Sequence, residues 1–277
     1  MEEVVVAVDG SEQSVFKGLR VGHELHQQAS LPLRLLSVVD DEGKEQERRR
    51  EIRYLLPLGE VGNPLVAGSE IEVEVAHDPR AFLAQALGER DGALFCMATR
   101  GRGAVGQAVV GSVATSVLRE AHRPMILAGP GLPDDWSGPV LRVVVPLDGS
   151  EVSERILPYA VELAEELGTE LRLLRVIDTE GEDADSGDFQ ASVEAYLEQV
   201  GERLQPELSR SVTWVVLKDR QPARAISDYC AGRGSLVMMS TLGWSGLARL
   251  VMGSVAQALV RQAPFPVGVL CPPDTAA

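Results

Sequence analysis

The sequence predicts an α/β fold made of two tandem doubly wound domains, each a five-stranded parallel sheet with helices on both faces. The first observation is an internal repeat: VVVAVDGSE at 4–12 returns as VVVPLDGSE at 143–151, with seven of nine positions identical. Such a repeat indicates a duplicated module. The second is that Val-, Ile- and Leu-rich runs alternate with amphipathic segments, as in sheets buried on both faces. The length of 277 residues also suits two domains of ~150 residues.

The first half is expected to contain five strands joined by helices. Four apolar runs and the alternating segment EIEVEVA predict strands at 4–8, 33–39, 70–76, 93–98 and 124–128. Periodic amphipathic or charged segments predict helices at 11–29, 44–53, 78–90 and 110–121. Parallel neighbours need right-handed crossover connections, which these helices supply.

The second half repeats this order. Its strands are predicted near 142–147, 171–177, 212–217, 235–240 and 266–270. Its helices are predicted near 151–167, 188–204, 222–232 and 253–262. Between the halves, GPGLPDDWSGP is dense in Gly, Pro and Asp and has no periodicity, which is typical of a linker. We therefore expect domains at 1–129 and 140–277, with the linker at 130–139.

Composition and charge narrow the function classes. The net charge of −15 repels polyanions, which argues against nucleic acid and anionic membranes as partners. No apolar run approaches the ~18 residues of a membrane span. The chain opens into a strand pattern without a basic, signal-like segment, so a cytoplasmic location is expected. The acidic segment TEGEDADSGD at 179–188 lacks a recognisable ligand spacing and is interpreted as a solvated loop, so no metal site is predicted.

Each half has an Asp-Gly-Ser sequence directly after its first strand, at Asp9 and at Asp148. Ligands of doubly wound sheets bind at the carboxyl ends of the strands, where a carboxylate can accept hydrogen bonds from a ribose or a base. The alternative is helix capping by Ser11 and Ser150, with the glycine easing the turn. The equivalent placement of the two copies favours a ligand role.

A glycine-rich segment follows the fourth strand of each half. Gly101 and Gly243 are each followed by nine residues and then by Gly-Ser-Val, at 111–113 and 253–255. Glycine lets the main chain approach a phosphate closely, and a helix start directs free N–H groups at it. No Lys precedes the Ser, unlike the phosphate loop of NTPases, and no GxGxxG follows the first strand. Helix capping alone is the competing explanation.

At these residues the chain resembles the universal stress protein family, in its tandem two-domain form. The ATP-binding members carry Gly, two residues, Gly, nine residues, then Gly with Ser or Thr. The second glycine and the Gly-Ser pair match in both halves, while Ala98 and Ser240 replace the first glycine. The resemblance implies an adenine nucleotide alpha hydrolase-like fold with strand order 3-2-1-4-5. It also places the adenosine-contacting Asp at Asp9 and Asp148.

The resemblance implies one nucleotide site in each half, and the sites are expected to differ. Arg100 and Arg102 flank the first glycine loop and can neutralise a polyphosphate, whereas Leu242 and Trp244 flank the second. The implied contact residues are Ala7, Val8, Asp9, Val38, Met97, Ala98, Arg100, Gly101, Arg102, Gly111, Ser112 and Val113 in the first half, and Pro146, Leu147, Asp148, Val176, Met239, Ser240, Gly243, Gly253, Ser254 and Val255 in the second. ATP is the expected ligand, with Mg²⁺ accompanying a triphosphate; ADP and AMP stay open.

The expected function is that of a nucleotide-binding sensor or regulator in a stress response, and not that of an enzyme. The histidines lie away from both glycine loops and form no acid/base constellation, so any ATP hydrolysis would be slow and incidental. The alternative is an interaction scaffold that has lost ATP binding. In this family domains commonly pair along their last strands, here about 125–128 and 267–270, which implies an intramolecular pseudo-dimer and leaves a further homodimer open.

Overall fold

The computed structural model describes residues 1–11, 14–55, 69–99, 111–180, 187–241 and 252–272. The strands of the first half are β1 (Glu3–Ala7), β2 (Leu33–Val39), β3 (Glu70–Val75), β4 (Ala93–Ala98) and β5 (Met125–Ala128). Its helices are α1 (Leu19–Ala29), α2 (Glu45–Leu55), α3 (Pro79–Glu89) and α4 (Ser112–Ala121). A π-helical turn, Ser14–Gly18, precedes α1, and a 3-10 turn, Glu42–Lys44, precedes α2.

The second half has the same order of strands. They are β6 (Arg142–Pro146), β7 (Glu170–Ile177), β8 (Val212–Lys218), β9 (Ser235–Ser240) and β10 (Val267–Leu270). Its helices are α5 (Glu151–Glu154), α6 (Leu157–Glu166), α7 (Gly187–Leu204), α8 (Pro222–Cys230) and α9 (Ser254–Gln262), with a 3-10 turn at Gln205–Glu207 after α7.

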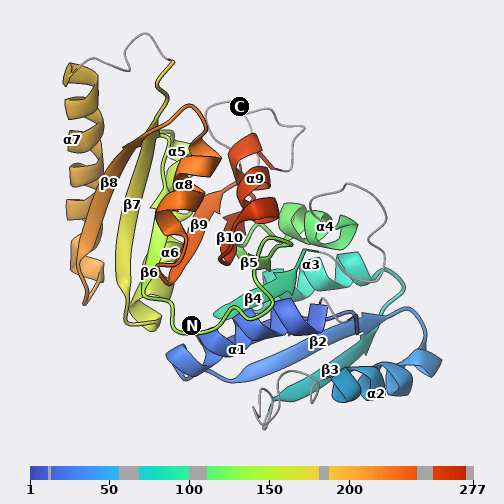
Figure 1. Ribbon diagram of the computed structural model, residues 1–277. Helices are drawn as coiled ribbons and strands as arrows, with labels where there is room; N and C mark the ends of the chain where they lie inside the picture. Colours follow the sequence, from blue (N-terminus) through green and yellow to red (C-terminus); the bar gives the residue numbers. More distant parts are fainter. Residues whose placement is uncertain (12–13, 56–68, 100–110, 181–186, 242–251, 273–277) are drawn as a thin grey trace.

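The strands form one ten-stranded sheet in the order β3-β2-β1-β4-β5-β10-β9-β6-β7-β8 (Figure 1). Pairing within each half is parallel and follows the order 3-2-1-4-5. Two buried clusters cover the two faces: one includes residues of α1, α6 and α7, and the other includes residues of α3, α4, α8 and α9. The predicted doubly wound α/β fold is therefore confirmed.

One predicted helix of the second half is broken in the structure. The sequence pattern gave a single helix over 151–167, whereas α5 ends at Glu154 and α6 begins at Leu157. Pro158 has no N–H to donate to the carbonyl of Glu154, and its ring would collide with that carbonyl in a continuous helix. The regular helix is therefore interrupted at Arg155 and Ile156, which form a turn and keep right-handed helical φ and ψ.

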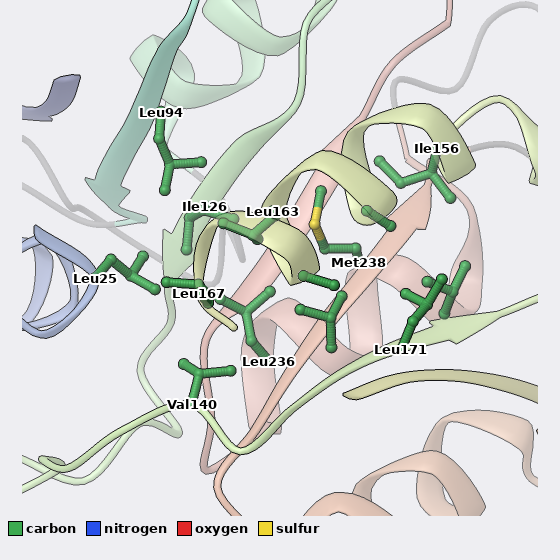
Figure 2. Close-up of a cluster of buried hydrophobic side chains, with 14 of the residues drawn as sticks. Leu25, Leu94, Ile126, Val140, Ile156, Leu163, Leu167, Leu171, Leu236 and Met238 are labelled. Carbon is green, nitrogen blue, oxygen red and sulfur yellow. The ribbon is translucent and has the colours of Figure 1, made fainter. Parts of the chain in front are cut away.

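The two halves meet along their last strands. β5 and β10 pair in antiparallel register, with Val267 opposite Leu127 and Val269 opposite Met125. These are the two strands whose pairing the family resemblance implies. The core also runs across this junction: Leu25 and Ile126 of the first half belong to the same buried cluster as Leu163 of the second (Figure 2). The halves are thus joined by a shared sheet and by shared packing.

The side chain of Gln28 on α1 ties the first half to the start of the second. Its amide nitrogen donates to the carbonyls of Val140 and Leu167, each at 2.9 Å, and its oxygen accepts the N–H of Val140 at 2.8 Å. We expect Gln28→Ala to lower the free energy of unfolding by about 1–2 kcal/mol, because three partly buried backbone groups lose this partner. Chemical denaturation measures the change. Gln27→Ala, at the exposed neighbouring position, is the control, and an equal loss in both variants would contradict this role.

Candidate functional site

The turn after the first strand of each half holds a carboxylate in a defined orientation. Asp9 Oδ1 accepts the backbone N–H of Ser11 at 2.9 Å and the Ser11 hydroxyl at 2.6 Å. Asp148 Oδ1 accepts the same two groups of Ser150, at 3.0 and 2.5 Å. Both aspartates are half-buried at the carboxyl end of a central strand. Equivalent turns in the two halves thus present the same acidic group at the same place in the fold.

Helix capping and the aspartate turn coexist in the second half. The Ser150 hydroxyl accepts the backbone N–H of Ser153 at 3.1 Å, so Ser150 is the N-cap of α5, as the capping interpretation predicts. In the first half, residues 12 and 13 lie outside the described residues. The glycines of both turns have positive φ, 73° at Gly10 and 80° at Gly149, a conformation that favours glycine.

The start of the helix after the fourth strand is also built identically in both halves. Gly111 donates its N–H to the carbonyl of Thr99 at 2.8 Å, and Gly253 donates to Thr241 at 2.6 Å. A Cβ at either glycine would stand 3.0 or 2.9 Å from that same carbonyl oxygen. Any larger residue would crowd this close main-chain contact, which favours glycine in both copies of the repeat.

The N-caps of α4 and α9 are the glycines Gly111 and Gly253, and neither helix has a side-chain cap hydrogen bond from the residues that the structure describes. Ser112 and Ser254 are instead the first helical residues, so capping by serine, the competing explanation of the Gly-Ser pair, is wrong here. A helix start without a side-chain cap leaves its first N–H groups and positive dipole end available to an anion. Strands β1 and β4 are neighbours, with Ala7 opposite Met97, so the aspartate turn and this helix start meet at one sheet edge.

Buried hydroxyl groups line the same edge. Thr99, Ser240 and Thr241 follow or end the fourth strands, and each is at least 95% buried. Their side-chain oxygens have no hydrogen-bond partner among the residues that the structure describes. Buried polar groups are normally satisfied, so these three hydroxyls are exceptions among the described residues of this edge.

An arginine that the sequence analysis did not single out lies in the second site. Arg175, on β7 next to Val176, donates to the carbonyl of Leu147 at 3.5 Å, and its Nη1 would stand 2.9 Å from a Cβ at Gly149. Burial lowers the pKa of Arg175, and the charge of Asp148 opposes that shift. The register puts Ser37 of β2 at this position in the first half, so alignment of the two copies could have flagged the difference.

The substitution Gly149→Ala should destabilise the second half more than a positive φ alone explains. The strain of a Cβ at φ 80° costs roughly 1 kcal/mol, and displacement of the Arg175 guanidinium adds to it. Gly168→Ala is the matched control, because Gly168 has φ 61° with nothing within 4 Å of the added Cβ. Thermal unfolding of both variants measures the difference. Equal loss of Tm would show that Arg175 does not occupy this space.

The structure places most of the expected site residues at the carboxyl ends of the central strands. Ala7, Val8 and Asp9 end β1 or follow it, Val38 lies near the end of β2, and Met97 and Ala98 end β4. Their counterparts in the second half occupy the same positions on β6, β7 and β9. These counterparts are Pro146, Leu147, Asp148, Val176, Met239 and Ser240. Val113 and Val255 lie in the first turns of α4 and α9. Arg100, Gly101, Arg102 and Gly243 lie outside the described residues.

Helices α1 and α4 place three of the histidines. His23 and His26 lie on α1 with ring centres 5.7 Å apart, and His122 follows the end of α4 opposite to Gly111. No group of three or more His, Cys, Asp or Glu residues in the described ranges has metal-binding geometry. The cysteines are buried and free, and burial raises the pKa of Cys230 to about 11, so its thiol stays protonated at neutral pH. Among the described helices, none is both long and apolar enough to cross a bilayer.

Comparison with known proteins places both halves of the chain in one family. The universal stress protein family profile matches residues 1–128 and 140–270. The universal stress protein Rv2005c of Mycobacterium tuberculosis is 32% identical over 179 residues, which span 62% of this chain and 59% of that protein. MJ0531, a universal stress protein of Methanocaldococcus jannaschii, is 29% identical over 48% of this chain and 82% of its own length. The solved structure of a universal stress protein from Archaeoglobus fulgidus shares the fold, with a TM-score of 0.65, 20% identity, and coverage of 97% of this chain and 98% of its own.

Proposed function

Because the chain belongs to the universal stress protein family, we propose that each half binds an adenine nucleotide and that the protein is a nucleotide-dependent regulator in a stress response. The observation that carries the proposal is the duplicated edge: an oriented aspartate beside a glycine-started helix without a side-chain cap, in both halves. The two units are residues 1–129 and 140–277, with 130–139 as the linker. The proposed location is the cytoplasm.

The site residues have distinct roles in this proposal. Asp9 and Asp148 accept hydrogen bonds from the ribose or the adenine, and Val38 and Val176 lie against the base. The N-termini of α4 and α9 receive the phosphates, because their N–H groups and dipoles favour anions. ATP is the proposed ligand, and Mg²⁺ accompanies the triphosphate. Binding, and not turnover, is the proposed activity, with any hydrolysis slow.

The two sites are proposed to be unequal. Arg175 adds a cation beside Asp148 in the second half, while the first half has Ser37 there and carries Arg100 and Arg102 in its glycine loop. A guanidinium contributes most where it contacts phosphate, so the first site is proposed to favour the triphosphate.

Equilibrium titration with ATP, ADP and AMP, each with and without Mg²⁺, tests this proposal. We expect saturable binding of adenine nucleotides with a preference for ATP in the presence of Mg²⁺, and two classes of site. GTP at equal concentration is the control for general anion binding. Absence of saturable binding for all three adenine nucleotides would contradict the proposal.

A nucleotide-independent scaffold is the second candidate. Ala98 and Ser240 in place of the family's first glycine favour it, as does the continuous sheet that joins the halves. Mass spectrometry of material extracted from the purified protein separates the two candidates. A scaffold predicts no bound nucleotide and no change in thermal stability when ATP is added.

A further inference from the structure

Three arginines of the second half, Arg142, Arg172 and Arg233, form a cluster around Tyr229. The guanidinium carbons of Arg142 and Arg233 lie 5.9 and 5.1 Å from the centre of the tyrosine ring. Arg172 donates a hydrogen bond of 2.5 Å to the tyrosine hydroxyl. The cluster lies at the amino ends of β6 and β7, whereas the candidate nucleotide sites lie at the carboxyl ends. It is therefore separate from both of them.

Few negative groups offset this cluster. Glu170 forms an ion pair with Arg172, and both Arg172 and Arg142 favour its charged form. Burial alone would raise the pKa of Glu170, but hydrogen bonds from Thr213 and Arg172 outweigh that effect and lower it. Among the described residues, no carboxylate forms an ion pair with Arg142. Glu170 therefore interacts with two of the three guanidinium groups, those of Arg172 and Arg142.

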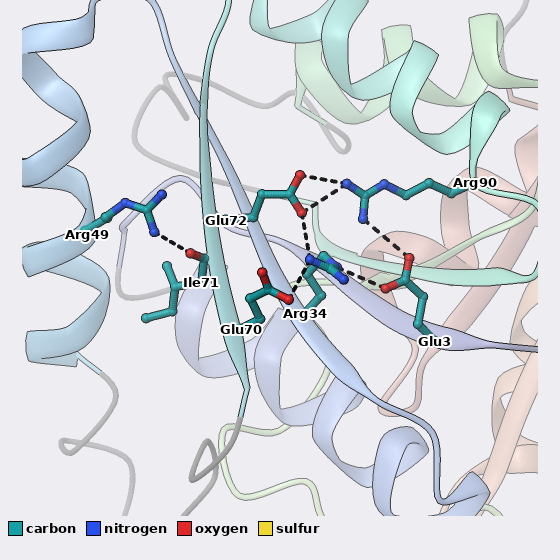
Figure 3. Close-up of polar contacts among 7 residues, drawn as sticks. All are labelled: Glu3, Arg34, Arg49, Glu70, Ile71, Glu72 and Arg90. Carbon is teal, nitrogen blue, oxygen red and sulfur yellow. Dashed lines mark hydrogen bonds and ion pairs between the residues drawn. The ribbon is translucent and has the colours of Figure 1, made fainter.

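At the equivalent end of the sheet in the first half, each arginine is paired with glutamates (Figure 3). Glu3 opens β1 as Arg142 opens β6, and each is in register with the first residue of the neighbouring fourth strand. Arg34 lies 3.0, 2.8 and 3.2 Å from the carboxylates of Glu3, Glu70 and Glu72. Arg90 lies 2.8 Å from Glu72 and 3.4 Å from Glu3.

The two halves therefore carry opposite charge at equivalent places. In the first half, three carboxylates face two guanidinium groups, for a net charge of −1. In the second half, the three guanidinium groups around Tyr229 and the carboxylate paired with Arg172 give a net charge of +2. This excess stands out in a chain with a net charge of −15. Neighbouring like charges are unfavourable, and a bound anion offsets their repulsion.

A buried hydroxyl lies beside the cluster. Ser235 on β9 is in register with Arg142 and is 2% exposed. The hydroxyl of Ser235 lies next to the Cys230 thiol. The Ser235 oxygen makes no hydrogen bond of normal geometry with the described residues. The equivalent position in the first half is Ala93, next to Glu3. The exchange of an acid for an arginine thus coincides with the gain of a hydroxyl, and both changes suit an oxyanion.

We propose that the cluster of Arg142, Arg172 and Arg233 binds a phosphate-class oxyanion. Guanidinium groups bind phosphate through paired, charge-assisted hydrogen bonds, and the side chain of Tyr229 contacts all three of these. The phosphate belongs either to a small free compound or to a phosphorylated side chain of a partner. The proposal does not depend on nucleotide binding, because the cluster lies at the other end of the sheet.

Titration of inorganic phosphate into ¹⁵N-labelled protein, with and without saturating ATP, tests the proposal. The arginine Nε–Hε signals of the cluster report the binding. We expect these signals to shift saturably under both conditions. In Arg142→Glu, which installs the residue type of the first half, affinity should fall by at least about tenfold. Arg119→Glu, an exposed change of equal charge on α4, should leave affinity unchanged.

A phosphoserine tripeptide and its unphosphorylated form distinguish the two sources. Tighter binding of the phosphopeptide than of inorganic phosphate indicates a phosphorylated partner, whereas equal binding indicates a free phosphate compound. Arg233→Ala serves as a second variant in case Arg142→Glu unfolds, and circular dichroism checks both. The proposal is overturned if neither phosphate nor phosphopeptide shifts the cluster signals, or if folded Arg142→Glu and Arg233→Ala bind as tightly as the unaltered chain.

Discussion

The variants Asp9→Asn and Asp148→Asn should each weaken nucleotide binding in their own half by roughly 10–100-fold, and the double variant should lose measurable binding. Asparagine keeps the Oδ1 acceptor that holds Ser11 or Ser150, so the turn is retained. What is lost is the negative charge and one acceptor oxygen for the ligand. A charged hydrogen bond contributes about 1.5–3 kcal/mol, which sets the expected size of the effect.

Isothermal titration with ATP measures this loss, and the chain offers a matched control. Asp219 accepts the backbone N–H of Gln221 at 2.8 Å in a turn of similar geometry. This turn follows β8, an edge strand, and not one of the central strands. Asp219→Asn should therefore bind ATP like the unaltered protein. If the double variant keeps full affinity, or if Asp219→Asn loses as much, the aspartate turns do not form the nucleotide sites.

The variant Gly129→Ala should lower the free energy of unfolding by about 3 kcal/mol, and Tm by roughly 6–10 °C. Gly129 follows β5 at the junction of the halves, and a Cβ there would stand 1.8 Å from the carbonyl oxygen of Val260 on α9. Backbone cannot move aside as a flexible side chain can, so β5 or α9 must shift. A Cβ at Gly131 would be similarly crowded, at 2.4 Å from the carbonyl of Gln262.

Chemical and thermal unfolding measure this effect. Gly88→Ala is the control, because Gly88 lies inside α3 with nothing within 4 Å of the added Cβ, and alanine there should be neutral or stabilising. A loss of stability at Gly88 equal to that at Gly129 would indicate a general intolerance of alanine. No loss at Gly129 would contradict the close packing of the linker on the second half.

The fold and the symmetric part of the site could be predicted from the sequence because both depend on local patterns read twice. The parallel doubly wound arrangement followed from alternating buried strands and crossover helices, whereas the strand order was implied by the family resemblance. The aspartate turns and glycine-started helices followed from short repeated motifs. The break between α5 and α6 was missed although Pro158 was visible, because the apolar periodicity continues on both sides of it.

Other features depend on contacts between distant residues. Arg175 on β7 donates to the carbonyl of Leu147, which follows the neighbouring strand β6. Gln28 donates to the carbonyl of Val140, 112 positions away in the sequence. No periodicity encodes such pairs. The linker was expected from its composition alone, yet Gly129 and Gly131 pack against α9 and Leu132 is 1% exposed. Its glycines and prolines mark a segment fixed by packing, which composition does not distinguish from a loose tether.

The most direct test of the central claim is to count bound nucleotides by native mass spectrometry of the 277-residue chain with ATP and Mg²⁺. The duplicated site predicts two nucleotides per chain at saturation, one in either single aspartate variant and none in the double variant. A chain that binds no nucleotide at saturating ATP, or that still binds two when both aspartates are replaced, would contradict it.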